Sequence, residues 1–388
     1  MRDETRMLLE SVGRLFEDHC TKDVADRAET GAFPDALWQA ISETGVPLAA
    51  LPESAGGADA EWSDLFAVLR VAGRYAAPIP LAETMLAAWV ASAAGLPISE
   101  EPMTVGPVRA DDRLTLERDG NGWRLSGRAS RLPWGAQAER IVLLADGPDG
   151  EMAVALDGTA GAELSPGRNM AGEPRDTLGF AGMRVAGDAV APVARGVDRA
   201  AVYRRGALAR ATLMAGAMER ALDTAVTYAG ERKQFGRPIA KFQAIQQQLA
   251  VMAGQVAAAG AAADAGVQAL SRGDPAMEEF LIAIAKTRVG DAATLAAEIA
   301  HQVHGAIGFT KEYSLQLTTR RLWSWRDEFG PDVELAARIG CSTTAVSASS
   351  RRNSSAAWST STTGCAAATT TSSCTPTRPG ASSASRAS

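Results

Sequence analysis

The chain has 388 residues, of which 46% are hydrophobic, so it can bury the core of an enzyme-sized globular protein with roughly two or three structural units. Its formal net charge is −6, and its Lys and Arg residues are spread among acidic ones. Because binding to a phosphate backbone requires a clustered basic surface, this distribution argues against nucleic acid as a partner.

The first residues of the chain are charged, and they lack the apolar segment of a secretory signal. No apolar run approaches the roughly 18 residues of a membrane span, so we expect a cytoplasmic protein without one. Of the four cysteines, only Cys20 lies outside the last 48 residues, and no Cys or His spacing is typical of a metal site. We therefore expect neither a disulfide framework nor a zinc site.

Residues 1–100 have a helical pattern. Leu8, Val12 and Phe16 recur at helical spacing, and a second helical stretch runs from Trp62 to Tyr75. The segment between these stretches contains Pro52 and paired glycines, which are typical of an irregular loop. This part of the chain is therefore predicted to be an N-terminal helical domain.

Residues 101–194 have a different pattern. Short alternating runs such as 114–117, 123–125 and 141–144 are separated by turns containing Asp-Gly, Asn-Gly or Gly-Pro. This pattern predicts a small antiparallel β domain in the middle of the chain.

Residues 195–340 return to long Ala-rich helices, in which Ile245, Leu249, Met252 and Val256 mark one apolar face. A bundle of four or five helices is the natural interpretation. Residues 341–388 are rich in Ser, Thr and Ala and have no apolar periodicity. They resemble an out-of-frame translation, the alternative being a genuine disordered tail.

The strongest motif is the segment 231–246, which interrupts two predicted long helices and contains arginines, glycine, proline and several side-chain amides. A cation and amides beside a helix start suit the pyrophosphate of a dinucleotide. As a bare pattern, the segment is also compatible with an ordinary corner between two helices.

This segment resembles the motif of the acyl-CoA dehydrogenase family, in which Arg, Phe-Gly, Ile, Phe-Gln and Gln recur at fixed spacing. A second block, residues 301–312, is similar to the family's element Gln-x-x-Gly-Gly-x-Gly-Phe-Thr-x-Glu, with Ala306 in place of a glycine. With weaker matches in the N-terminal half, the resemblance covers about residues 1–339.

The resemblance implies a mainly α fold, with an N-terminal helical domain, a central small β domain and a C-terminal four-helix bundle. It also implies FAD at a subunit interface, an acyl-CoA substrate, a dimer of dimers and electron-transferring flavoprotein as the acceptor. Carried over by position, the residues that contact FAD bound mainly by a neighbouring subunit are Arg232, Gln234, Phe235, Gln243, Gln302 and Gly305. His304 is expected to pack or to act indirectly, because no nucleophile or metal ligand accompanies it.

In this family a carboxylate removes the α-proton of the thioester while the β-hydrogen leaves as hydride. Such a base needs an apolar setting that raises its pKa. Counting along the family pattern places it at Phe329, whereas the carboxylates Glu328 and Asp327 stand one and two places earlier, respectively. A shift of one residue on a helix turns a side chain by about 100°. Glu328, or else Asp327, is the predicted base; the alternative is that Glu328 is a surface acid, either solvated or paired with an arginine.

A second position that the family uses for the base corresponds to Gly206, so no carboxylate is available there. Glu219 lies more than three turns further along the same predicted helix. We interpret it as an acid on the face of that helix.

The predicted β domain departs from the family where members usually face the flavin ring. The family's Thr-Glu-Pro loop is replaced by residues 103–107, and its Lys-x-Trp/Phe-Ile-Thr strand by residues 128–133. Trp134 follows closely and is a candidate to shield a ring.

Three functions remain open from the sequence. The leading one is an FAD-dependent acyl-CoA dehydrogenase that converts the thioester to the 2-enoyl-CoA, as a homo- or heterotetramer. The second is a non-catalytic partner that completes the FAD site of a different subunit. The third is a related flavoprotein that acts on a substrate other than a CoA thioester.

Overall fold

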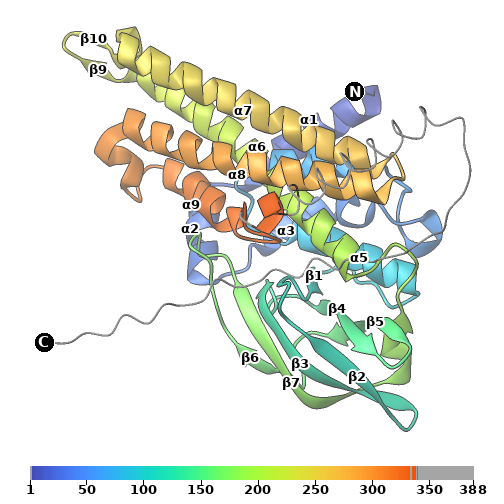
Figure 1. Cartoon of the computed structure of the whole chain (residues 1–388). Coiled ribbons are helices and arrows are strands. Elements are labelled where there is room, and N and C mark those ends of the chain that lie inside the picture. The colour runs from blue at the N-terminus through green and yellow to red at the C-terminus, as the bar shows by residue number, and fades with distance from the viewer. Residues whose placement is uncertain (1, 333, 338, 340–388) are drawn as a thin grey trace, which may run out of the picture. The chain divides into compact units, whose positions relative to one another are not determined.

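The computed structural model describes residues 2–332, 334–337 and 339, and these belong to one compact unit. The predicted tail, residues 341–388, lies outside the described residues. Figure 1 shows long helices on one side and a sheet on the other. The expected fold class, mainly helical with a central sheet, is confirmed. The limits proposed for the domains stay predictions.

Five helices precede the sheet. They are α1 (Asp3–His19), α2 (Lys22–Thr30), α3 (Asp35–Ser42), α4 (Trp62–Arg74) and α5 (Leu81–Ala94), with the short 3-10 helices η1 (Val46–Leu48) and η2 (Glu53–Ala55). The apolar residues spaced along α1 face the core, since Val12 and Phe16 are fully buried. Helix α5 is buried nearly all round, since it lies between the other helices and the sheet.

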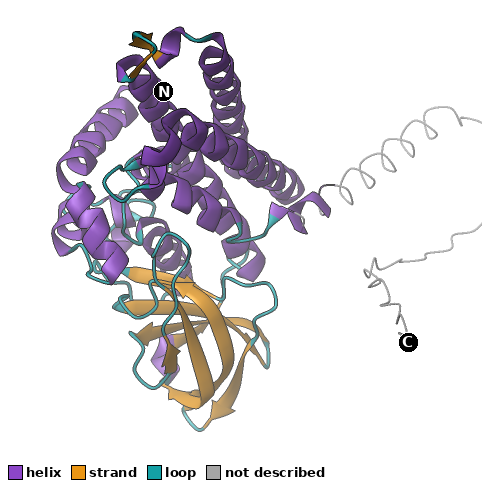
Figure 2. Cartoon of the chain, turned by 90° about the vertical axis from the view of Figure 1, so that its left-hand side faces the viewer, coloured by secondary structure: helices purple, strands orange, loops and turns teal. Residues whose placement is uncertain are grey.

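The strands form one sheet, which Figure 2 shows below the helices. The strand order in the described residues is β6-β7-β3-β2-β4-β5-β8, with β1 paired to β4. These strands are β1 (Met103–Gly106), β2 (Leu114–Asp119), β3 (Gly122–Pro133), β4 (Arg140–Gly147), β5 (Gly150–Asp157), β6 (Glu163–Ser165), β7 (Arg175–Val185) and β8 (Val190–Pro192), with the 3-10 turn η3 (Gly187–Ala189) before β8.

The expectation of an antiparallel sheet needs one correction. Strand β4 pairs in parallel with β1, and at one position also with β2. A parallel pair requires a long connection rather than a tight turn, so Asp-Gly and Asn-Gly signals in the sequence do not reveal it. Strand β4 is buried on both faces because α5 covers one of them, and the sequence shows this as the continuous apolar run 141–145.

The C-terminal part contains the long helices of the bundle. They are α6 (Arg199–Glu231), α7 (Gln243–Leu270), α8 (Pro275–His304) and α9 (Leu315–Arg326); between them lie β9 (Lys233–Gln234), β10 (Arg237–Pro238), η4 (Ile239–Lys241) and η5 (Gly305–Phe309). Helix α6 begins at a capping bond from the Ala201 amide to the Asp198 carboxylate, 2.8 Å long. Helix α8 begins the same way at Asp274, with Pro275 in its first turn.

Helix α7 is long and apolar enough to cross a membrane by length and composition alone, and 33% of its most apolar window is buried. This differs from the expectation that no segment approaches that threshold. The reason is its alanine content, which gives a window of moderate mean hydropathy without a run of large apolar residues. One such helix is weak evidence, because helices of a soluble bundle pass the same test.

Helix α4 crosses α6 at a very short distance, and two glycines make this possible. A Cβ at Gly73 would lie 2.1 Å from the carbonyl oxygen of Leu213, and one at Gly216 would lie 1.9 Å from that of Arg70. Both obstacles are backbone atoms, which cannot rotate away. The contact joins the N-terminal helices to the bundle.

We predict that Gly216→Ala destabilises the fold by about 2–3 kcal/mol, because the added methyl group forces the two helices apart. The matched control is Gly230→Ala in the same helix, where the site is exposed and nothing lies within 4 Å. There alanine should stabilise the protein by about 1 kcal/mol through its helix propensity. Chemical denaturation measures both, and equal effects would contradict the close crossing.

Candidate active site and cofactor-binding surface

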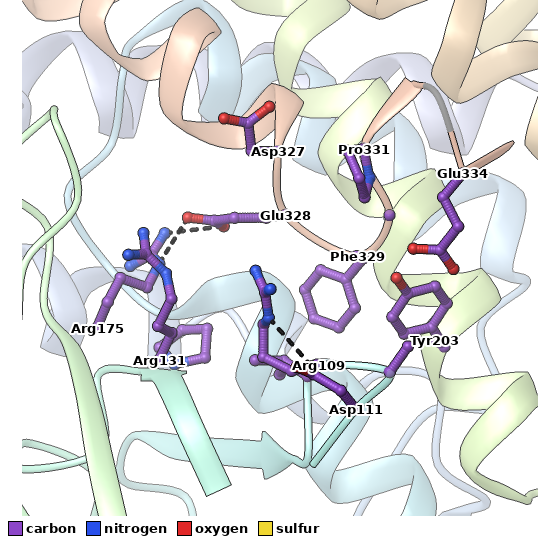
Figure 3. Close-up of a pocket in the computed structure, with 14 residues that line it drawn as sticks. Arg109, Asp111, Arg131, Arg175, Tyr203, Asp327, Glu328, Phe329, Pro331 and Glu334 are labelled. Atoms are coloured by element: carbon purple, nitrogen blue, oxygen red, sulfur yellow. Dashed lines mark hydrogen bonds and ion pairs between the residues drawn. The ribbon is translucent and has the colours of Figure 1, made fainter. Parts of the chain in front are cut away.

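A cavity of about 450 Å³ lies between the sheet and the bundle, and it holds the predicted catalytic carboxylates (Figure 3). Its walls come from residues 108–111 after β1, from β3 and β7, from the first turns of α6, and from residues 327–331 after α9. Segments far apart in the sequence thus meet at the place where the resemblance puts substrate chemistry.

Glu328 is held inside two ion pairs. Its Oε1 accepts from Nε of Arg175 at 2.7 Å and its Oε2 from Nε of Arg210 at 2.6 Å, with a second bond from Arg175 at 3.0 Å. Burial alone would raise the pKa of Glu328, but the two guanidinium charges outweigh it and lower the pKa to about 2. The sequence-based expectation was a base with a raised pKa, and the structure shows the opposite shift.

The ion pairs around Glu328 belong to a larger buried network. Arg210 also pairs with Glu83 of α5, and Arg175 with Glu173 at 2.9 Å. Glu173 in turn faces Arg321 of α9 at 3.1 Å. Three arginines and three glutamates thus compensate one another inside the protein. Glu328 is neither a surface acid nor a free carboxylate, and of the two alternatives open from the sequence it is the arginine-paired one.

Asp327 is the other predicted carboxylate. It is exposed at the end of α9 and points away from the arginines of the cavity (Figure 3). Its backbone amide bonds to the Ser324 carbonyl at 3.4 Å, which continues the last helical turn. Asp327 therefore lies at the rim of the cavity.

The two family positions for the base, Phe329 and Gly206, meet in space. A Cβ at Gly206 would lie 2.3 Å from two ring carbons of Phe329, so the ring rests directly on the backbone of α6. Phe329 has a left-handed backbone (φ +53°) and its side chain is buried. Counting along the sequence located both positions, and neither carries a carboxylate.

The wall contributed by β3 is irregular where the sequence departs from the family pattern. The β3–β7 register shifts between Ala129 and Leu132, and Arg131 has a left-handed backbone (φ +55°). Arg131 and Pro133 line the cavity. Trp134, the candidate ring shield, is instead buried against Phe33 in an edge-to-face contact at 6.0 Å.

The residues predicted to bind FAD all lie on the protein surface. Four of them are in or beside the β9–β10 hairpin, namely Arg232, Gln234, Phe235 and Gln243, and two are at the end of α8, namely Gln302 and Gly305. The ring of Tyr228, near the end of α6, stacks on His304 at 4.5 Å. This contact places both groups at the same end of the bundle.

This surface has the chemistry to bind a diphosphate. Within the described part of the chain, the side chains of Arg232, Gln234, Gln243 and Gln302 make no hydrogen bond, so their donors are available to a ligand. Phe235 is 92% exposed, which for a large aromatic side chain marks a contact surface. These groups fit the phosphates and rings of FAD, and their assignment stays a prediction.

His304 packs as expected. It is buried, its Nδ1 lies 2.7 Å from the carbonyl oxygen of Ala300, and its Nε2 lies 3.2 Å from the Tyr313 hydroxyl. Burial lowers its pKa, so it stays neutral at pH 7. Glu219, interpreted as a helix-face acid, pairs with Arg70 of α4 at 2.6 Å.

Comparisons with known proteins agree with the resemblance. The family model for the acyl-CoA dehydrogenase N-terminal domain matches residues 2–97, and the one for the C-terminal domain matches residues 199–330. The chain belongs to the acyl-CoA dehydrogenase family. This is a family of oxidoreductases, and FAD is its cofactor.

Among curated relatives, acyl-CoA dehydrogenase IpdE2 of Mycolicibacterium smegmatis is 26% identical, over 87% of this chain and 98% of its own length. A 3-sulfinopropanoyl-CoA desulfinase of Paraburkholderia xenovorans is 28% identical, over 82% of this chain and 90% of its own. In the ChsE4-ChsE5 complex from Mycobacterium tuberculosis, a chain superposes with a TM-score of 0.79 at 20% identity, covering 89% of this chain and 98% of that one.

We predict that Glu328→Gln destabilises the protein by about 3–5 kcal/mol at pH 7, because it leaves the buried network with three arginines against two glutamates. The pKa of Glu328 is lower in the folded state than the ordinary value of 4.5. Its ionised form therefore stabilises the fold fully above about pH 4.5, and this contribution is lost as the pH falls toward 2.

Denaturation curves between pH 7 and pH 3 measure this effect. The variant should lose less stability over that range than the wild type does. Asp327→Asn is the control at the neighbouring position, where an exposed side chain should change stability by less than about 0.5 kcal/mol. Equal curves for Glu328→Gln and the wild type would show that the ion pairs contribute nothing.

Proposed function

We propose that this chain is one subunit of a heteromeric FAD-dependent acyl-CoA dehydrogenase and that it completes the FAD site of a different, catalytic subunit. The observation that carries the proposal is the contact between Phe329 and Gly206, which fills both base positions of the family without a carboxylate. Glu328, the acid next to Phe329 in the sequence, is fixed between two arginines with its pKa at about 2. A base must accept a proton near neutral pH, and Glu328 is poorly suited to do so.

The reaction proposed for the whole enzyme is α,β-dehydrogenation of an acyl-CoA to the 2-enoyl-CoA. When bound, FAD supplies the acceptor for the β-hydride, and the neighbouring subunit supplies the base for the α-proton. In this chain Arg232 provides a charge-assisted donor to the diphosphate, and Gln234 and Gln243 provide neutral donors. Gln302 and Gly305 extend the same surface, and Phe235 packs against the bound group.

The proposal includes the assembly and its surroundings. If FAD binds between subunits, a neighbouring chain has to lie against the exposed hairpin. A dimer of dimers places one there. The ChsE4-ChsE5 complex, one chain of which has this fold, supports a heteromer. Electron-transferring flavoprotein is the proposed acceptor of the electrons, and the cytoplasm the proposed location.

A second candidate is a self-sufficient dehydrogenase in which Glu328 or Asp327 is the base. It is favoured by one observation, namely that both carboxylates line the cavity beside Tyr203 and Phe329. It would require Glu328 to leave Arg175 and Arg210 when substrate binds.

We predict that the purified chain shows no bleaching of flavin absorbance when acyl-CoAs are added without oxygen. Co-expressed with a homologous subunit that carries the family's carboxylate, it should form a complex that bleaches. Arg232→Ala should lower the FAD content of that complex several-fold, whereas Lys233→Ala, an exposed neighbour on the same hairpin, should not. Stoichiometric bleaching by the pure chain, abolished in Glu328→Gln, would establish the second candidate instead.

A further inference from the structure

One face of α8 holds the segment that carries Phe329. Lys286, Gly290 and Thr294 stand four residues apart, so they lie one above the other on this helix. The Lys286 ammonium is fully buried and donates to two carbonyl oxygens, that of Arg326 at 2.5 Å and that of Gly330 at 3.2 Å. The two acceptors flank the turn 327–329, so a single side chain ties both of its ends.

Gly290 and Thr294 hold the same segment, and we refer to these two residues together with Lys286 as the α8 clamp. A Cβ at Gly290 would lie 2.4 Å from Oδ1 of Asp332, so only glycine lets this carboxylate approach the helix. Asp332 binds Nε of Arg326 at 2.5 Å, and Nη1 of Arg326 donates to the Thr294 hydroxyl at 2.8 Å. The end of α9 and the residues after the turn are therefore bound to the same stretch of α8.

Phe329 needs such support, because a bulky residue with φ +53° has a disfavoured backbone. Its ring is enclosed by the Gly206 backbone, by Tyr203 at 6.1 Å between ring centroids and by the Arg210 guanidinium at 5.4 Å. The ring forms a wall of the 450 Å³ cavity. Released from the turn, it would leave apolar space between that cavity and α6.

We infer that Phe329 closes the cavity on its α6 side against an acyl chain in this subunit and that Lys286 is the positioning residue that holds it closed. The inference deepens the proposed function and rests on it, since it states why this subunit takes no acyl chain into its own cavity. Phe329 thereby keeps acyl chains out of this cavity, and the α8 clamp fixes the position of its ring.

The charges around Lys286 support the arrangement. Asp332, Glu328 and Asp327 favour its ammonium form, and Arg210 opposes it. Burial dominates and lowers the pKa of Lys286 to about 8, so at pH 7 the ammonium is charged and its hydrogen bonds to the two carbonyls are charge-assisted.

The test compares Phe329→Ala with Phe329→Leu in the full chain, using calorimetric titration with butyryl-, hexanoyl- and octanoyl-CoA. Removing the ring leaves an apolar hole, and such holes stay dry and bind apolar groups. Phe329→Ala should bind at least one of these acyl-CoAs ten-fold tighter than the wild type does, at one per chain. Phe329→Leu keeps most of the volume and should resemble the wild type. Wild-type affinity in Phe329→Ala would overturn the inference.

Lys286→Met tests the positioning role, because it keeps the length of the side chain and removes its donors. It should reproduce the gain in affinity, which general damage to the fold would not produce. If Lys286→Met does not fold, Thr294→Val loosens the same clamp more gently. It should speed hydrogen exchange at the amides of residues 327–330 and raise the affinity in the same direction. A folded clamp variant that binds like the wild type would show that Lys286 does not position Phe329.

These outcomes are separate from those of the proposed function. Flavin bleaching by the pure wild-type chain would refute the partner-subunit role whatever the affinities of the variants. Unchanged affinities in a chain that does not bleach would refute only the closure by Phe329.

Discussion

The rest of the structure depends on the buried ion network around Glu328. A single buried charge costs several kcal/mol unless it is paired, so the partners must all be in place at once. They come from α5, α6, α9 and the segment that leads into β7. The N-terminal helices, the sheet and the bundle therefore have to be in place together, because displacing one of them leaves buried charges of the others without partners, and the cavity lies where they meet.

The same network decides what the cavity can do. Arg175 and Arg210 give Glu328 a stable partner and thereby remove its ability to accept a proton near neutral pH. The position that follows is filled by an aromatic ring held on a glycine of α6, so this part of the cavity is packed like a core. A structure optimised for internal charge compensation is a poor setting for a catalytic base, and this trade-off underlies the proposal of a partner subunit.

The sequence predicted those features that depend on neighbouring residues. Helical spacing in α1 and α7, the alternation in the strands and the position of the break after α6 are all local. The ion pairs could not be predicted from the sequence, because Arg210 and Arg175 stand 118 and 153 residues from Glu328 and no periodicity links them. Counting by resemblance found Phe329 and Gly206 separately, yet their contact required the fold. Lys286 gave no signal, since a lysine on a helix usually faces solvent.

The cofactor surface and the cavity differ in whether their side chains find partners within the chain. Around the cavity, Glu328 and its arginines bind one another, and Phe329 packs on α6. On the hairpin, by contrast, the side chains of Arg232, Gln234 and Gln243 make no hydrogen bond to another described residue, and Phe235 projects into solvent. An exposed aromatic beside unused donors adds nothing to the stability of the isolated chain, so its use must come from something bound from outside. The charged groups at the cavity are therefore compensated within the chain, whereas the donors at one end of the bundle are unused, which is the arrangement that a subunit contributing to its neighbour's site requires.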